Sequence, residues 1–132
     1  KNTGGKRSKL EEWLETKLNQ RYPSLIINYN DTEAINLELD IYIPLFSLAF
    51  ELNGVLHYEP IFGKEKFENI KSHDQTKDVT CMENNIELHV VDTSSIRDKF
   101  KPKKGEFVLN IISSIIDKKL YNQFGMIPTL AE

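Results

Sequence analysis

Two neighbouring segments of this chain carry acidic side chains that could bind a divalent cation. Residues 37–43 and 48–53 alternate apolar with polar side chains, which is typical of β-strands with one buried face. Their second face carries Glu38, Asp40, Glu51 and Asn53. The three carboxylates have no lysine or arginine among them, and like charges facing each other across strands are destabilising. A hard cation such as Mg²⁺ would remove that penalty; the alternative is an ordinary solvated sheet face.

A histidine and an aspartate could add acid–base chemistry beside these carboxylates. His57 lies in the loop that leaves the second segment, and Asp74 falls in the apolar stripe of a helix predicted over 64–84. A carboxylate on an apolar face is costly unless it is paired. Pairing with His57 would orient the imidazole as a general base. The alternative is an ion pair between Asp74 and Lys77, one helical turn away.

A further acid lies on the helix predicted to begin after Ser8 and to end at Pro23. Ser8 and Glu11 have the spacing of a capping box. On a helical wheel, Glu11 lies at the edge of the buried face, whereas Glu12 points almost opposite. Glu11 could therefore cap the helix, face the sheet, or do both.

The elements that would position these residues follow one another in the order α-β-β-β-α-β-α. After the first helix, we predict strands over 25–29, 37–43 and 48–53, a helix over 64–84, a strand over 86–91 and a helix over 106–120. The second and third strands should form an antiparallel hairpin, Asn30-Asp31 a turn, and residues 96–104 a basic loop. This order predicts an α/β fold with a mixed sheet flanked by helices. Residues 1–7 would be a flexible lead-in, 8–120 the domain and 121–132 a C-terminal tail.

The composition limits the class of protein. A chain of 132 residues with 39% hydrophobic and 28% charged residues suits one globular domain. No apolar run reaches the ~18 residues that a membrane span needs, and no signal peptide is visible. The single cysteine, Cys81, excludes an internal disulfide and a thiolate zinc cluster. We therefore expect an intracellular protein without a membrane partner.

The charge is unevenly distributed. The net charge of −3 is not that of a typical nucleic-acid binder. One basic cluster holds Lys1, Lys6, Arg7 and Lys9, and another holds Arg97, Lys99, Lys101, Lys103 and Lys104. Either cluster could contact phosphates; the alternative is that both are solvated ends and loops.

Taken together, these motifs resemble a known group of nucleases. The runs 37–44 and 48–54, followed by His57, resemble the core of nucleases related to the very short patch repair endonuclease, within the PD-(D/E)xK superfamily. The segment with His73-Asp74 and Lys77, and the strand after it, are similar to the elements that follow in these proteins. The resemblance extends from Ser8 to about Val91.

The resemblance is closest to the phage homing-endonuclease branch that is described by an E-D-x-H-D pattern. The pattern falls on Glu11, Asp40, a variable position near Glu51, His57 and Asp74. Two positions depart from the wider superfamily: Asn53 replaces the usual lysine, and Leu39 replaces the usual proline before Asp40. Both departures fit the repair-like branch, in which histidine is the working base, and they leave open whether Glu51 binds metal directly.

The resemblance implies a restriction-endonuclease-like fold and metal-dependent hydrolysis of DNA phosphodiester bonds. Asp40 would bind Mg²⁺ or Mn²⁺, helped by Glu51 or a nearby carbonyl group. His57, oriented by Asp74, would accept a proton from the attacking water. Glu11 would hold a water molecule at the metal or help to position the base. Lys77 would contact a phosphate or pair with Asp74.

The resemblance also implies DNA as the partner, in a homing endonuclease or a repair-type nickase. The residues expected to contact DNA are Lys6, Arg7, Lys9, Lys101, Lys103 and Lys104. A homodimer would allow cleavage of both strands, and a DNA-targeting domain could precede Lys1. The expected setting is the cytoplasm or nucleoid of a bacterial or phage-infected cell. The alternatives are a non-catalytic module that binds DNA or protein, and a nuclease for RNA or branched DNA.

Overall fold

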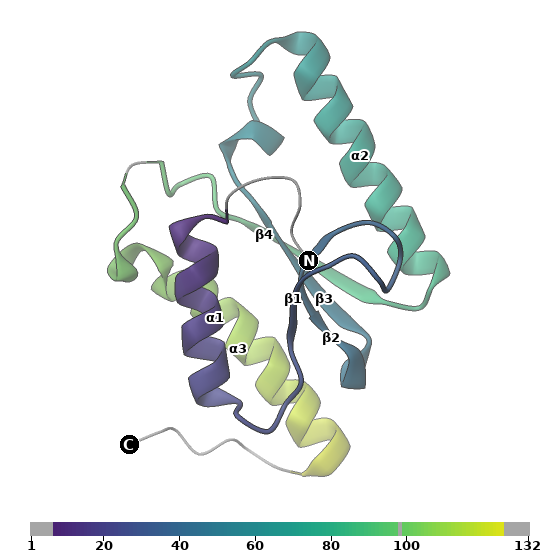
Figure 1. Ribbon diagram of the computed structural model, residues 1–132, viewed down its shortest axis with the longest axis vertical. Helices are drawn as coiled ribbons and strands as arrows, with labels where there is room; N and C mark the ends of the chain where they lie inside the picture. The colour runs from purple at the N-terminus through teal and green to yellow at the C-terminus, as the bar shows by residue number, and fades with distance from the viewer. Residues whose placement is uncertain (1–6, 98, 126–132) are drawn as a thin grey trace.

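The computed structural model describes residues 7–97 and 99–125 and contains one four-stranded sheet and three long helices (Figure 1). The elements are α1 Lys9–Arg21, β1 Asn28–Asp31, β2 Leu39–Ile43, β3 Leu48–Asn53, α2 Lys64–Glu83, β4 Glu87–Asp92 and α3 Pro102–Phe124. Two short 3₁₀ helices, η1 Pro44–Phe46 and η2 Val55–His57, follow β2 and β3. The predicted order of elements and the α/β class are confirmed.

The sheet is mixed, as predicted. Its strand order is β1-β2-β3-β4, with antiparallel pairing of β1 to β2 and of β2 to β3 and parallel pairing of β3 to β4. The hairpin pairs Ile41 with Phe50 and Ile43 with Leu48. Ser47 closes it in the left-handed region, with φ 47°. A parallel neighbour needs a crossover, and α2 supplies it between β3 and β4.

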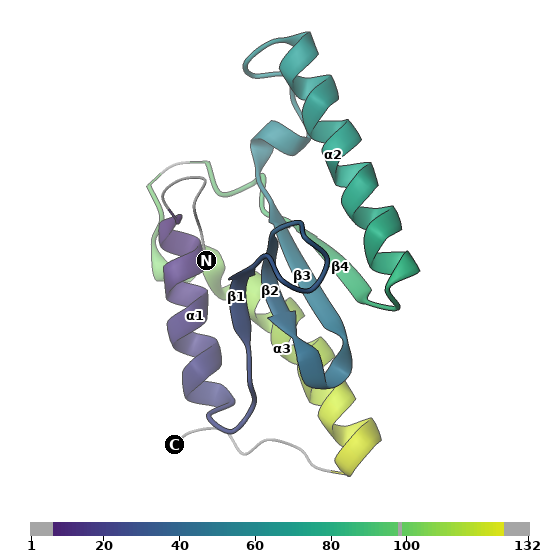
Figure 2. The ribbon, with the colours of Figure 1, turned by 45° about the vertical axis from the view of Figure 1, so that its right-hand side comes forward.

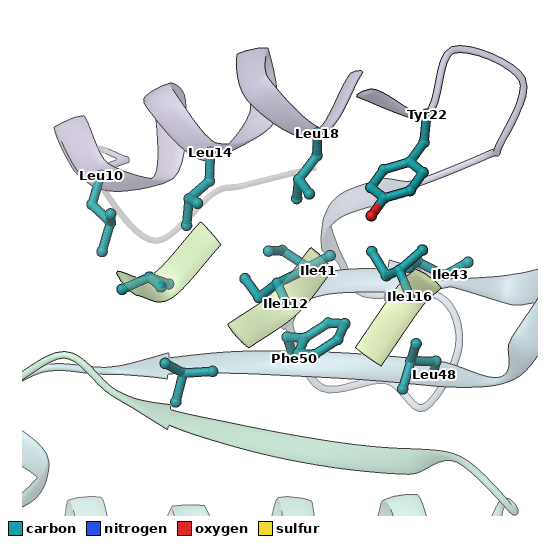
Figure 3. Close-up of a cluster of buried hydrophobic side chains, with 12 residues drawn as sticks. Leu10, Leu14, Leu18, Tyr22, Ile41, Ile43, Leu48, Phe50, Ile112 and Ile116 are labelled. Atoms are coloured by element: carbon teal, nitrogen blue, oxygen red, sulfur yellow. The ribbon is translucent and has the colours of Figure 1, made fainter. Parts of the chain in front are cut away.

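The main core lies between the sheet and the pair α1 and α3. Figure 3 shows leucines of α1 and isoleucines of α3 meeting the side chains of β2 and β3. The buried members include Leu14, Leu18, Ile41, Ile43, Leu48, Phe50, Ile112 and Ile116. Gly105 sets the spacing of the two helices, because a Cβ there would lie 2.8 Å from Cζ3 of Trp13 and 3.1 Å from Cδ1 of Leu10.

The opposite face of the sheet is covered by α2, which stands away from α1 and α3 (Figure 2). A smaller cluster there holds Ile35, Leu39, Ala49, Cys81 and Ile86. Of the stripe expected on α2, only Cys81 is buried, whereas Phe67 and Ile70 are half-buried. Only the C-terminal part of α2 is therefore packed tightly, and its N-terminal part leaves room over the sheet.

The apolar face predicted for the hairpin is divided near Asp40. Ile41 and Ile43 pack in the main core, but Leu37 and Leu39 pack in the cluster under α2. The backbone pairing of β2 with β3 begins only at Ile41. Asp40 thus lies where one apolar face gives way to the other.

Several predicted boundaries are wrong. The first strand begins three residues later and ends two residues later than expected, so Asn30 and Asp31 belong to it and not to a turn. Asn30 adopts φ 53° and donates from Nδ2 to Glu38 Oε2 (2.7 Å), which holds it within the sheet. Helix α3 begins at Pro102, whose fixed φ suits a first turn, so the expected loop ends earlier. It continues to Phe124, beyond the expected start of the tail at residue 121.

No helix in the described part of the chain has the length and apolar character needed to cross a membrane.

Candidate active site

The centre of the site is a pair of carboxylates, each of which accepts a hydrogen bond from the backbone of the opposite strand. Asp40 lies opposite Glu51 in the register that pairs Ile41 with Phe50. The backbone N–H of Asp40 donates to Glu51 Oε2 (2.8 Å), and the N–H of Leu52 donates to Asp40 Oδ2 (2.8 Å). The backbone pairing of β2 with β3 ends next to Asp40. Side-chain oxygens there accept the N–H groups that carbonyl oxygens accept within a sheet. Both carboxylates are consequently held by rigid backbone and lie close together.

Burial makes this pair electrostatically unfavourable. Glu51 is 7% exposed, and burial, followed by the charge of Glu51, raises the pKa of Asp40 to about 8. Burial also raises the pKa of Glu51, although Lys77 opposes the shift. Two carboxylates that share a low-dielectric site resist double ionisation. A cation placed between them would reverse that preference.

One cation already reaches the pair from α2. Lys77 Nζ donates to Glu51 Oε1 (2.7 Å), and the two side chains are 13% and 9% exposed. The ion pair between Lys77 and Asp74 that the sequence allowed is therefore not formed. The strand sequences alone suggested that the carboxylates lack a basic partner. Helix α2 turns Lys77 toward the sheet and supplies that partner.

The second part of the site is the predicted pair of His57 and Asp74. His57 Nδ1 lies 2.8 Å from Asp74 Oδ2 and 3.1 Å from Oδ1, so this contact is confirmed. An ionised carboxylate only accepts, which places the proton on Nδ1 and leaves Nε2 as the basic atom of the neutral ring. Position comes from η2, where the His57 N–H donates to the Gly54 carbonyl (3.0 Å), and from Lys71, which donates to the His57 carbonyl (3.2 Å).

A pocket of about 340 Å³ joins the two parts, between α2 and strands β3 and β4. Its lining includes Glu51, Asp74 and Lys77, and the last two are one helical turn apart. Asp40 and His57 are not in the lining, but each contacts a residue that is. Asp74 with its partner His57, and Lys77 with its partner Glu51, therefore meet at the walls of one pocket.

Glu11 both caps α1 and acts on the carboxylates of the sheet, as the sequence allowed. The capping box is present: the Glu11 N–H donates to Ser8 Oγ (3.1 Å), and the Ser8 N–H donates to Glu11 Oε1 (2.8 Å). The charge of Glu11 also contributes to the raised pKa of Asp40. The carboxylate thus caps α1 and lies within electrostatic reach of the pair.

The residues expected to contact DNA differ in their surroundings. Lys6 lies outside the described residues, and Arg7 is engaged in an ion pair with Glu15 (2.5 Å). Lys9, Lys101 and Lys103 are exposed, whereas Lys104 is half-buried and donates to the Lys99 carbonyl (3.2 Å). Lys103 and Lys104 lie in the first turn of α3 and not in a loop.

The described basic residues at the start of α1 and at the start of α3 lie at the same end of the molecule. Gly105 packs on Trp13 and Leu10, and the rings of Trp13 and Phe100 are 5.8 Å apart between centroids. The beginnings of α1 and α3 are therefore side by side, which the sequence does not reveal.

The sequence analysis missed two neighbours of the pair of His57 and Asp74. Tyr58 ends the short helix η2, where its backbone N–H donates to the Val55 carbonyl (3.0 Å). Lys71 lies over the Tyr58 ring, 5.6 Å from its centroid, and lines the pocket. The spacing of Lys71 from Asp74, three residues on one helix face, could have indicated its position. Nothing in the sequence singles out Tyr58 beyond its place next to His57.

The carboxylates of the site offer few donors for a metal ion. Among residues 7–97 and 99–125, no group of three or more histidine, cysteine, aspartate or glutamate side chains is arranged to hold one. Asp40 and Glu51 form a group of two. Mg²⁺ commonly binds proteins through one or two carboxylates and keeps several waters. The pair therefore fits Mg²⁺ in charge and in donor type.

Comparisons of the chain with protein-family models, with curated proteins and with solved structures found no match.

Proposed function

We propose that this protein is a metal-dependent DNA endonuclease domain with a restriction-endonuclease-like fold. The observation that carries the proposal is the close pair of half-buried Asp40 and buried Glu51, beside a pocket whose wall holds the aspartate that orients His57. Lys77 balances the charge of Glu51, but this ion pair does not account for the half-buried Asp40 beside it or for the oriented imidazole on the next element. Strongly perturbed carboxylates of this kind are typical of catalytic sites.

The side chains would divide the work of phosphodiester hydrolysis. Asp40 and Glu51 would hold Mg²⁺ or Mn²⁺, which supplies Lewis-acid polarisation of the phosphate and stabilises its developing charge. His57 Nε2 would take a proton from the attacking water, because Asp74 fixes the other ring nitrogen. Asp74 would then stabilise the imidazolium that forms. Glu11 would assist from the end of α1 through its charge near Asp40.

The arrangement also bears on the missing lysine of the superfamily pattern. Asn53 stands at that position, where it is buried and lines the pocket. Lys77 brings an ammonium to Glu51 from α2 instead. This supports the resemblance, because the site contains acid, base and ammonium groups although one of them comes from a different element.

A plasmid assay tests the proposal. Supercoiled DNA should be nicked in the presence of Mg²⁺ and not in EDTA, and Asp40→Asn should lower the rate by about 100-fold or more. Asp78→Asn is the matched control, because Asp78 lines the same pocket but is exposed and makes none of the contacts described above. Circular dichroism establishes that both variants are folded. Parental cleavage by folded Asp40→Asn would overturn the assignment.

A non-catalytic binding module is the second candidate, and one contact favours it. Lys77 already neutralises Glu51 without a metal, as a purely structural site would require. This candidate predicts retention of DNA with no cleavage in Mg²⁺ or Mn²⁺. Linear, branched and RNA substrates in the same assay separate a DNA endonuclease from the RNA and junction alternatives. As a DNA endonuclease, the protein would act in the cytoplasm or nucleoid. A double-strand break would need a homodimer or two successive nicks.

A further inference from the structure

The contact between Lys77 and Glu51 uses an oxygen that a metal would need. Three of the four oxygens of the two carboxylates already accept a hydrogen bond. Asp40 Oδ2 and Glu51 Oε2 each accept a backbone N–H at 2.8 Å from the opposite strand. Glu51 Oε1 is the atom bound to Lys77 Nζ (2.7 Å). The oxygen of Glu51 that the backbone leaves available is thus the one occupied by the ammonium.

We propose that Lys77 is a built-in counter-ion that Mg²⁺ must displace from Glu51, so that Lys77 sets the metal affinity of the site. This inference rests on the proposed function, since it concerns the same pair of carboxylates. After displacement, the ammonium of Lys77 is free to meet a phosphate oxygen in the pocket that it lines. Lys77 is therefore a positioning residue that acts through Glu51.

Competition follows from the charge and burial of the contact. The Lys77 and Glu51 side chains are 13% and 9% exposed, so solvent and salt screen the ammonium weakly. An ammonium and a divalent cation on one carboxylate would repel each other strongly at such short range. The two cations therefore exclude each other on Glu51.

The pocket gives the displaced side chain somewhere to go. Lysine has a flexible four-carbon stem, and the space beside it measures about 340 Å³. Asp74 lines that space on the same helix. Lys77 can therefore leave Glu51 without becoming a buried, unpaired charge, and α2 need not move.

Direct metal binding without DNA tests the inference. The probe is Mn²⁺, measured by electron paramagnetic resonance of the free ion and confirmed by Mg²⁺ competition. Lys77→Gln should bind Mn²⁺ at least about tenfold more tightly than the parent, because the competing cation is gone while a neutral hydrogen-bond donor remains. A merely structural role for Lys77 predicts the opposite sign, since loosening the site would weaken binding.

Lys71→Gln is the matched control. Lys71 lines the same pocket and carries the same charge, but it donates to the His57 carbonyl and not to a carboxylate. We expect its Mn²⁺ affinity to change by less than about threefold. Equal tightening in both variants would show a general effect of charge and would overturn the inference. Unchanged affinity in Lys77→Gln would overturn it too.

A measurement on the parent protein covers the case in which Lys77→Gln does not fold. Side-chain ammonium signals are followed by nuclear magnetic resonance during a Mg²⁺ titration, with Lys77→Arg identifying the Lys77 signal. That signal should shift with the midpoint of metal binding, and the Lys71 signal should not. A Lys77 signal that stays unchanged at saturating Mg²⁺ overturns the inference while leaving the proposed function intact. No Mn²⁺ binding by the parent or by Lys77→Gln would instead remove the metal from the proposed function.

Discussion

At the scale of single residues, Asp40 should make stability depend on pH. Its pKa is raised to about 8 by burial and by Glu51, whereas an exposed aspartate titrates near 3.9. A carboxyl group with a raised pKa stabilises the fold fully below its unfolded pKa, and this contribution is lost as pH rises through the folded value. In EDTA, the free energy of unfolding should therefore fall between about pH 4 and pH 8.

Asp40→Asn provides the comparison for that prediction. The variant carries no titrating group at this position. Between about pH 4 and pH 8, the parent should therefore lose at least about 1 kcal/mol more unfolding free energy than the variant does. Urea denaturation at several pH values measures both proteins. Parallel pH profiles for parent and variant would contradict the assigned environment of Asp40.

His57 should matter to rate far more than to stability. We expect His57→Ala to lower the rate of DNA cleavage by about 100-fold, the usual scale for loss of a general base, and to remove the rise in rate with increasing pH on the acidic side of the pH–rate profile. Single-turnover cleavage measures this rate. His73→Ala is the control, because His73 is exposed on α2. An unchanged pH profile in His57→Ala would show that another group is the base.

The sequence predicts the members of the site better than their contacts. The pairing of Asp74 with His57 could be predicted because a carboxylate on an apolar helix face needs a partner. The pairing of Lys77 with Glu51 could not, since it depends on how the crossover lays α2 over the sheet, 26 residues along the chain. The exchange of hydrogen bonds between Asp40 and the opposite strand is likewise set by where the ladder opens.

At the scale of elements, the contact of α1 with α3 is set by Gly105. A Cβ there would lie 2.8 Å from the Trp13 ring, which is too close for any unstrained contact. Alanine is favoured over glycine within helices by about 1 kcal/mol, but overpacking costs about 1–3 kcal/mol. We expect Gly105→Ala to lower the free energy of unfolding by about 1 kcal/mol, measured by urea denaturation.

A double-variant cycle shows whether the ring is the cause. Adding Trp13→Leu makes room at the contact, so Gly105→Ala should be neutral or stabilising in that background. The same loss in both backgrounds would mean that the strain lies elsewhere.

Elements with regular patterns were predicted and irregular ones were not. The hairpin strands alternate clearly, residues 64–84 contain no glycine or proline, and the ends of these elements agree with the expected ones within two residues. The first strand was misplaced because Asn30, a residue usual in turns, enters the sheet through its bond to Glu38. The start of α3 was missed because Pro102 and two lysines resemble a loop, although proline is well suited to a first helical turn.

At the scale of the whole molecule, the net charge of −3 opposes contact with DNA. Local groups must therefore provide the attraction. The start of α3 is suited to this, since Lys101 and Lys103 are exposed there beside the start of α1. Its first turn contains no acidic residue, so its lysines add to the positive end of the helix dipole. Phosphates would relieve both kinds of positive charge.

The double variant Lys101→Gln and Lys103→Gln should consequently bind duplex DNA less tightly. Each lost phosphate contact lowers the dependence of log Kd on log salt by about 0.9, so the slope should fall by about one to two. Fluorescence anisotropy in EDTA, in the Asp40→Asn background, measures binding without cleavage. The double variant Lys17→Gln and Lys118→Gln carries the same charge change at exposed positions further along α1 and α3. If both double variants lost affinity and slope equally, DNA would be attracted by net charge alone, and the start of α3 would not be its contact surface.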